Sequence, residues 1–332
     1  MKKDNILVIG ACGQIGAELV PALRQAYGDF HVLATDLRKP AAEFESDGPY
    51  EQLDVLDRRA ISSLITRYDI TQVYLLAATL SATGEKQPRK AWDLNMESLL
   101  NILELAKDQR LAKIFWPSSI AVFGPGAPRK NCSQQTLPDP TTVYGISKVA
   151  GEHWCQYYSR KYNVDTRGLR YPGLISHKTA PGGGTTDYAV DIFHQALSTQ
   201  HYTCFLEPDA RLPMMYMPDA IRATLELMDA PMASLSVRTA YNLAAMSFTP
   251  AELAAAITQY IPEFRIDYAP DYRQSIADSW PGSIDDTPAR RDWGWDHQFE
   301  LRATVRDMLL HLAKEPGLSS GKIPELLPGV FF

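Results

Sequence analysis

The sequence is poor in cysteine and has no surplus of positive charge. Four of its 332 residues are cysteines (Cys12, Cys132, Cys155 and Cys204), and no two of them form a Cys-x-x-Cys pair. This pattern argues against a disulfide framework or a cysteine-based zinc site and indicates a reducing compartment. Lysine and arginine number 33 against 39 aspartates and glutamates, a net charge of −6. Nucleic acids and anionic membranes are therefore not expected as partners.

Long hydrophobic runs are also missing. No apolar stretch approaches the roughly 20 residues that a membrane-spanning helix needs. Met1-Lys2-Lys3-Asp4 leads into the first predicted strand with no apolar leader before it. With 45% hydrophobic and 22% charged residues, the composition is that of a globular protein with one large domain or two. We therefore expect a soluble, cytoplasmic protein.

The first half of the chain alternates short apolar runs with amphipathic stretches. Strands are predicted at 5–9, 31–35, 72–78 and 112–117, and helices at 14–26, 58–68 and 91–109. Fully apolar strands separated by helices are typical of a parallel sheet that is covered on both faces. Right-handed crossovers then produce a Rossmann-type, doubly wound α/β sheet.

The sequence texture changes after about residue 176. A glycine-rich breaker occupies 181–184, and an apolar stretch at 241–244 is expected to return a strand to the first sheet. We therefore predict a dinucleotide-binding domain at 1–176 plus about 236–248. Residues 177–235 and 249–332 are assigned to a smaller C-terminal α/β lobe that binds the substrate.

A glycine-rich loop follows the first predicted strand. Gly10, Gly13 and Gly16 stand at the spacing that lets a backbone turn tightly and approach a pyrophosphate at a helix N-terminus. Such spacing also occurs in plain strand-to-helix turns, but Asp36 lies 20 residues beyond Gly16, where an acid binds the ribose hydroxyls and repels a 2′-phosphate. The expected cofactor is therefore NAD, although Arg38 is close enough to meet a phosphate. The residues expected to contact it here are Gly10, Cys12, Gly13, Gln14, Ile15, Gly16, Asp36, Leu37 and Arg38.

Two further strand ends are expected to line the cofactor. Asp54 and Val55 end one strand where the adenine would rest, and Leu76, Ala77 and Ala78 end the next. Small residues at these ends leave room for a ligand, and close packing alone explains any one of them equally well.

A Tyr-x-x-x-Lys motif opens a helical stretch at Tyr144 and Lys148. This spacing places both side chains on one helix face. A nearby ammonium favours the phenolate and lowers the tyrosine pKa, which makes tyrosine usable as an acid or base. Ser118 and Ser119 end a predicted strand and so bring hydroxyls to the carboxyl edge of the sheet, where ligands bind. A Tyr-x-x-x-Lys motif alone would more often belong to a solvated helix face. The functional interpretation therefore depends on its occurrence together with the glycine loop, Asp36 and the strand-end serines.

Together these motifs make the chain similar to the extended short-chain dehydrogenase/reductase family over essentially its whole length. The matching residues are Gly10, Gly13, Gly16, Asp54, Ala77, Ala78, Asn95, Ser119, Tyr144 and Lys148. The resemblance implies proton transfer by Ser119, Tyr144 and Lys148 while NAD exchanges a hydride, and it adds Asn95 and Leu174 to the cofactor site. One departure is Phe123, where family members often have tyrosine.

Three segments outside this shared core, at 80–85, 184–189 and 278–295, resemble the metal-independent, short-chain L-threonine 3-dehydrogenase branch, similar to UDP-galactose epimerase. The resemblance implies oxidation of L-threonine to 2-amino-3-oxobutanoate. Ser81, Thr185 and Thr186 are then candidates for holding the substrate, with Ser118, Ser119 and Tyr144, and Trp280 for closing over it. The alternatives are purely structural roles, in which Thr185 or Thr186 caps a helix beginning near Asp187 and Trp280 is a core residue.

Two rival functions stay open at this point. One is an NAD-dependent sugar-nucleotide epimerase or dehydratase, which needs basic groups for a diphosphate such as Arg211, Arg273, Arg290 and Arg291. The other is a non-catalytic NAD sensor, which the presence of Ser119, Tyr144 and Lys148 disfavours. No metal is predicted, because none of the seven histidines stands at ligand spacing from a cysteine.

A homodimer is expected from the resemblance. In related proteins the helices corresponding to 91–109 and 144–162 pair with their symmetry mates. Trp154, Tyr157 and Tyr158 would serve that face, although packing within one chain explains them almost as well.

Overall fold

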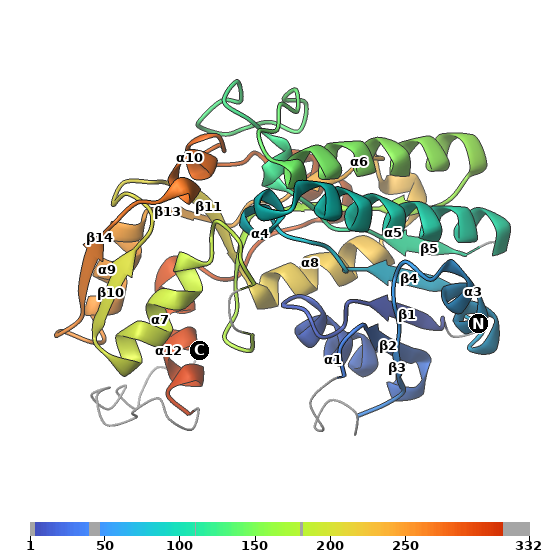
Figure 1. Ribbon diagram of the computed structural model, residues 1–332, viewed down its shortest axis with the longest axis horizontal. Helices are drawn as coiled ribbons and strands as arrows, with labels where there is room; N and C mark the ends of the chain where they lie inside the picture. The colour runs from blue at the N-terminus through green and yellow to red at the C-terminus, as the bar shows by residue number, and fades with distance from the viewer. Residues whose placement is uncertain (1–3, 40–46, 110, 180–181, 315–332) are drawn as a thin grey trace.

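The computed structural model describes residues 4–39, 47–109, 111–179 and 182–314. The predicted features at Met1–Lys3, at Pro181 and in the last part of the second lobe, 315–332, lie outside these residues. The central element is a six-stranded parallel sheet with the order β3-β2-β1-β4-β5-β7 (Figure 1). Its strands are β1 (Ile6–Ile9), β2 (Val32–Asp36), β3 (Tyr50–Gln52), β4 (Gln72–Leu75), β5 (Lys113–Phe115) and β7 (Thr166–Arg167). This is the Rossmann-type fold that the apolar strands predict.

Each face of the sheet carries its own apolar core. In β1, Ile6 and Val8 pack with residues of α1 (Gly16–Tyr27) and α8 (Met217–Asp229). Leu7 and Ile9 point the other way, toward α3 (Arg58–Arg67), α5 (Pro88–Gln109) and α6 (Val143–Tyr162). All four residues of β1 are buried. Alternate side chains of a strand leave opposite faces, so a strand covered on both sides is apolar throughout.

The strand predicted at 241–244 does not join the six-stranded sheet. It forms β12 (Tyr241–Asn242), which pairs in parallel with β8 (Leu169–Tyr171), and β8 pairs with β6 (Ser118–Ser119). These three strands form a short separate sheet, because Trp116-Pro117 interrupts the chain between β5 and β6 and Gly168 interrupts it between β7 and β8. The short sheet therefore continues the central one at its carboxyl edge.

A third apolar core lies in the C-terminal half, to the left in Figure 1. It packs α7 (Tyr188–Ser198), α9 (Pro250–Thr258) and α12 (Leu301–Leu312) against two small sheets. One sheet is β13 (Met246–Phe248), β11 (Leu212–Tyr216) and β9 (Gly173–Ile175), and the other is β10 (His201–Cys204) and β14 (Arg265–Tyr268). The remaining helices are α4 (Ser81–Lys86), α10 (Tyr272–Asp278), α11 (Thr287–Trp293) and the short helices Asp29–His31, Ile120–Val122 and Met232–Ser234.

Helix α8 does not lie in the second lobe, to which its residues were assigned. α8, within the stretch 177–235, packs against α1 on a face of the central sheet. The boundaries of the two predicted domains otherwise remain a prediction. All four cysteines are free, and no helix in the described part of the chain is long and apolar enough to cross a membrane.

A buried ion pair joins the short sheet to α6. Arg170 on β8 donates to both carboxylate oxygens of Glu152 on α6, with nitrogen-to-oxygen distances of 2.7 and 2.8 Å. The Ser118 hydroxyl donates to the same carboxylate at 2.6 Å, and Arg170 also reaches the side chain of Asn242 at 3.2 Å. One cluster of polar side chains therefore ties β6, β8, β12 and α6 together. A buried charge that loses its partner is strongly destabilising.

Replacing Arg170 with methionine will leave the Glu152 carboxylate buried without its counter-charge. We expect Arg170→Met to lower the free energy of unfolding by about 3–5 kcal/mol. Urea unfolding followed by tryptophan fluorescence measures this. The matched control is Arg89→Ala, which removes an exposed ion pair with Asp93 on α5 and should cost about 0.5 kcal/mol or less. Equal losses in the two variants would contradict the role of the buried pair.

Candidate active site

A cleft of about 660 Å³ lies at the carboxyl edge of the central sheet. Its walls come from the loop before α1, the segment after β4, the strand β6, the first turns of α6, the β8–β9 connection and the turn before α7. Ligands of open parallel sheets bind at this edge. The cleft therefore lies where the sequence motifs place the site.

The glycine loop forms one end of the cleft. Gly10 has a φ of 93°, and a Cβ there would lie 2.7 Å from the backbone nitrogen of Ala77. A Cβ on Gly16 would lie 2.4 Å from the carbonyl oxygen of Gly10. A Cβ on Gly13 would meet only that oxygen, at 3.3 Å. The first two glycines thus let backbone segments touch, whereas Gly13 keeps the space in front of α1 open, as a pyrophosphate requires.

Asp36 holds this loop from the end of β2. Its carboxylate accepts hydrogen bonds from the backbone N–H of Cys12 and of Arg38, both at 3.0 Å. The Arg38 guanidinium donates to the carbonyl of Cys12 at 2.7 Å. Arg38 lines the cleft, whereas Asp36 lies behind it and is 8% exposed. In this arrangement the aspartate positions the loop, and its remaining lone pairs stay available to a ribose.

The serine, tyrosine and lysine of the motif come together at the middle of the cleft. Tyr144 and Lys148 lie one turn apart at the start of α6, and the Lys148 Nζ is 5.4 Å from the centre of the Tyr144 ring. The same Nζ donates to the carbonyl of Pro117 at 2.6 Å and lies 4.3 Å from the centre of the Trp116 ring. Ser119, at the end of β6, is hydrogen-bonded to the Tyr144 phenol. These groups form one acid–base unit facing the cleft.

Burial shifts both proton affinities in the unit toward the neutral forms. It raises the pKa of Tyr144 to about 12, although the hydrogen bond with Ser119 acts in the opposite direction. Burial also lowers the pKa of Lys148 to about 7, against the raising effect of Cys155 and Glu152. The expectation that the ammonium lowers the tyrosine pKa is therefore wrong for this arrangement. Desolvation by burial is the largest cause of both shifts.

The other end of the cleft is lined by small hydroxyl side chains. The Ser81 hydroxyl, at the start of α4, lies 3.2 Å from that of Thr185, and both residues are buried. Thr186 lies beside them in the wall. The capping alternative for the threonines is wrong, because the N-cap of α7 is Asp187, whose carboxylate accepts from the N–H groups of Gly183 and Gly184 at 2.8 Å. That turn fixes where Thr185 lies.

Trp280 satisfies both readings of its role. It is 5% exposed and belongs to the apolar core of the C-terminal half, yet it also lines the cleft. Arg129 donates to its backbone carbonyl and so holds the segment in place.

Six residues predicted for the cofactor do not line the cleft: Asp36, Leu37, Asp54, Val55, Ala77 and Asn95. Leu37 is exposed, Val55 is buried, and Asp54 caps the turn at Leu56. Asn95 is buried in α5 and bonds both backbone groups of Thr79 and the hydroxyl of Ser147. It thereby fixes the wall after β4 against α6. The other predicted residues of the site line the cleft.

Four further lining residues lie in the segments singled out at 80–85 and 184–189 but were not named as site residues: Leu80, Thr83, Gly184 and Asp187. The sequence does not single out the remaining lining residues: Thr79, Pro117, Ile120, Tyr171, Pro172, Gly173, Thr179 and Gly182. Thr79 and Leu80 directly follow the strand predicted at 72–78, so the rule that ligands bind at the carboxyl ends of parallel strands also applies to them. Tyr171-Pro172-Gly173 had no comparable signal, because the short strands on either side of it are not resolved by sequence periodicity.

The arginines that a diphosphate would require are engaged elsewhere. Arg211 pairs with Glu252, Arg273 with Asp271, Arg290 with Asp286 and Asp296, and Arg291 with Asp292. None of the four lines the cleft. The charged side chains in its walls are Arg38, Lys148 and Asp187, of which only Asp187 belongs to the C-terminal half.

The glycine loop at a helix N-terminus, the parallel sheet and the tyrosine–lysine unit in the cleft define a nicotinamide-dinucleotide enzyme of the short-chain dehydrogenase/reductase class. The open space before Gly13 fits the pyrophosphate of NAD. Residues 6–244 match the model of the NAD dependent epimerase/dehydratase family, and the chain belongs to this family. NAD is its cofactor.

Three relatives illustrate the range of the family. An uncharacterized epimerase/dehydratase of Staphylococcus saprophyticus is 50% identical over 93% of this chain and 96% of its own. The holo form of a GalE-like L-threonine dehydrogenase from Cupriavidus necator is 58% identical, with a TM-score of 0.91 over 93% of this chain and 99% of its own. A monomeric L-threonine 3-dehydrogenase from a metagenome is 48% identical, with a TM-score of 0.89 over 92% and 98%.

Proposed function

We propose that the protein oxidises L-threonine at its 3-hydroxyl with NAD, forming 2-amino-3-oxobutanoate. The observation that carries this proposal is the substrate end of the cleft, where Ser81, Thr185 and Thr186 line the same cleft as the tyrosine–lysine unit and, among the described residues, no arginine or lysine of the C-terminal half lines it. Such a surface suits a small zwitterion with a hydroxyl group. The likeness to two L-threonine dehydrogenases supports it.

The proposed chemistry follows from the three polar groups. Bound NAD supplies the acceptor for the hydride that leaves Cβ of the substrate. Tyr144, as phenolate, takes the proton of the 3-hydroxyl, and Ser119 holds the oxygen from which that proton departs. Lys148, as ammonium, stabilises the phenolate. The C–H electron pair leaves as hydride while the O–H bond pair becomes the carbonyl π bond, so the products are a ketone, NADH and a proton.

The same walls orient and enclose the substrate. The hydroxyls of Ser81, Thr185 and Thr186 each donate to a carboxylate or accept from an ammonium. Trp280, buried beside them, keeps water from the path of the hydride. A sugar-nucleotide epimerase or dehydratase is the rival proposal, and the paired arginines outside the cleft are the observation that disfavours it.

An NADH assay tests the proposed reaction. Purified protein, NAD and L-threonine are mixed with a chelator, and absorbance of NADH is followed. We expect NADH formation with L-threonine, little with L-serine or D-threonine, and slower turnover with NADP because of Asp36. Tyr144→Phe should abolish turnover and leave NAD affinity, measured by calorimetry, nearly unchanged.

Each outcome separates the alternatives. If L-threonine yields no NADH while UDP-galactose is converted, the rival reaction replaces the proposed one. If Tyr144→Phe turns over at the wild-type rate, the tyrosine is not the base. NAD binding without turnover of any substrate would instead indicate a sensor.

The tyrosine–lysine unit predicts a specific pH profile. At low pH the pair holds two protons, and the first leaves with an apparent pKa of about 7, the value to which burial lowers Lys148. The active form is the singly protonated pair in which the proton is on lysine and the tyrosine is a phenolate. The fraction of singly protonated pairs that have this form does not change with pH. We therefore expect kcat/KM to rise about tenfold per unit below this pKa and to level off above it.

Lys148→Met is the comparison variant for this profile. In this variant Tyr144 is the one member of the pair that still titrates. Burial raises the pKa of Tyr144 to about 12. The variant's kcat/KM should be low at neutral pH and continue to rise through about pH 9. Steady-state rates from about pH 6 to 9.5 measure both profiles. A wild-type profile that climbs without a plateau would contradict the shared-proton description.

We further propose a cytoplasmic homodimer formed through α5 and α6, which lie side by side (Figure 1). Trp154 and Tyr157 are 39% and 41% exposed on α6, and Trp92 is 36% exposed on α5. Tyr158 drops out of this face, because it is buried and donates to Glu104.

Light scattering measures the assembly. We expect a mass of two chains for the wild type and one for the double variant Trp154→Glu/Tyr157→Glu, because buried carboxylates disfavour association. A single-chain mass for the wild type, as the name of the metagenome relative describes, would overturn the proposal.

A further inference from the structure

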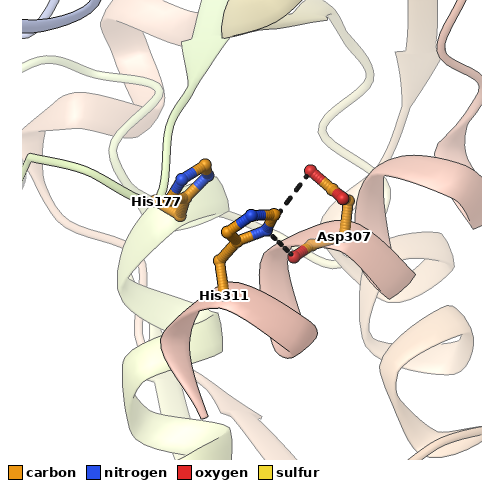
Figure 2. A group of neighbouring side chains, drawn as sticks. All are labelled: His177, Asp307 and His311. Atoms are coloured by element: carbon orange, nitrogen blue, oxygen red, sulfur yellow. Dashed lines mark hydrogen bonds and ion pairs between the residues drawn. The ribbon is translucent and has the colours of Figure 1, made fainter. Parts of the chain in front are cut away.

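Three side chains gather outside the cleft, between the end of β9 and helix α12. Figure 2 shows His177, Asp307 and His311, with His311 between the other two. One candidate ligand atom from each of the three lies within 4.8 Å of the other two, the one such group of three found in the described part of the chain. Asp307 and His311 are four residues apart on one helix face, and His177 follows β9. None of the three lines the cleft.

We propose that His177, Asp307 and His311 bind a divalent transition-metal ion, with zinc as the best fit. Two imidazoles and one carboxylate, completed by water, form a four-coordinate set that zinc takes in proteins. A pair of ligands four residues apart on a helix is a common half of such a site. The site is separate from the proposed reaction and does not depend on it.

Within the described residues, the hydrogen bonds engage one nitrogen of each imidazole and leave the other to act as a ligand. The Nδ1 of His311 lies 2.9 Å from the backbone carbonyl of Asp307, and a carbonyl only accepts, so this nitrogen carries the proton. The Tyr216 hydroxyl donates to the Asp307 carboxylate at 2.6 Å and therefore accepts from Nδ1 of His177 at 3.0 Å. In both rings Nε2 is left with its lone pair, which is the form that metals bind.

These same contacts are the supporting bonds that metal ligands usually have. A ligating imidazole commonly donates its other N–H to a carbonyl or to an oxygen that leads to a carboxylate, which fixes its tautomer. His177 has this arrangement, because the hydroxyl of Tyr216 links its Nδ1 to the Asp307 carboxylate. Nearby charge is mixed: Lys178 and Lys314 repel a cation, whereas Asp307 and the Glu18 carboxylate on α1 attract it.

One rearrangement accompanies binding. The rings of His177 and His311 are stacked, with centres 4.1 Å apart and planes at 18°, so their in-plane lone pairs lie in two nearly parallel planes. To converge on one ion, the His311 ring must turn out of the stack. Its side chain is 42% exposed, so solvent leaves room for that turn.

The bound ion would tie the C-terminal helix to the segment that carries part of the cleft wall. Leu174 and Thr179, on either side of His177, both line the cleft. Ser176 donates to Glu18 on α1, so the segment is already anchored on its other side. The ion would therefore act as a structural clamp on α12, stabilising the folded chain without entering the reaction.

Metal titration of the tag-free full chain tests the site. Zinc is added to metal-stripped protein in a calorimeter, and cobalt(II) is used in parallel for its visible absorption. We expect one ion per chain, with affinity about tenfold or more weaker in His311→Gln and in Asp307→Asn. Zinc should raise the Tm of the wild type by several degrees and leave that of His311→Gln nearly unchanged.

The matched control is His201→Gln. His201 forms an exposed pair with Asp267 at 2.9 Å but has no second histidine in a three-ligand group, so its loss should not change zinc affinity. Equal binding by the wild type and His311→Gln, or a thiolate charge-transfer band with cobalt, would overturn the proposal by showing only adventitious or cysteine-bound metal. Because Tm and stoichiometry are the readouts, failure here leaves the threonine assay unaffected.

Discussion

The buried pair of Arg170 and Glu152 is the interaction on which the active site depends. Glu152 lies on α6 one turn beyond Lys148, and Arg170 lies on the strand that pairs with β6. The pair thus joins the helix that carries Tyr144 and Lys148 to the strand that carries Ser118 and Ser119. Because both charges are desolvated, either one is tolerated only in the presence of the other. The ion pair therefore fixes the distance between α6 and β6, which are separate in the sequence.

The electrostatics of the site follow from the same burial. Lys148 has a carbonyl and an aromatic face beside its ammonium and no carboxylate in hydrogen-bonding contact. Burial lowers the pKa of Lys148 and raises that of Tyr144. A single proton on the pair therefore resides mainly on the phenol, and the form with a phenolate beside an ammonium is a minor one. This arrangement suits a step in which the tyrosine takes a proton only when a substrate hydroxyl is in place.

Charge is distributed very differently on the two sides of the cleft. The dinucleotide end has a helix N-terminus and Arg38, while the far end has hydroxyls and the single carboxylate of Asp187, itself occupied by two backbone N–H groups. Arg211, Arg273, Arg290 and Arg291 are instead paired with their own acidic neighbours. This contrast is the physical reason for favouring a small amino acid over a sugar nucleotide on a fold that serves both. The histidine–aspartate group near α12 lies outside this division.

The sequence by itself determined four strands of the central sheet, the glycine loop and the tyrosine–lysine motif, because each depends on residues close together in the chain. Apolar runs and helical patterns predict such elements, and glycine spacing predicts such a turn. Only the tertiary structure decided what depends on distant segments. It moved Asp36 behind the cleft wall, paired β12 with β8, engaged the four arginines with acidic partners, and brought His177 to Asp307 and His311 across about 130 residues. It also reversed the expected direction of the Tyr144 pKa shift. Desolvation depends on every atom packed around the phenol, and the sequence pattern does not show how many atoms pack there.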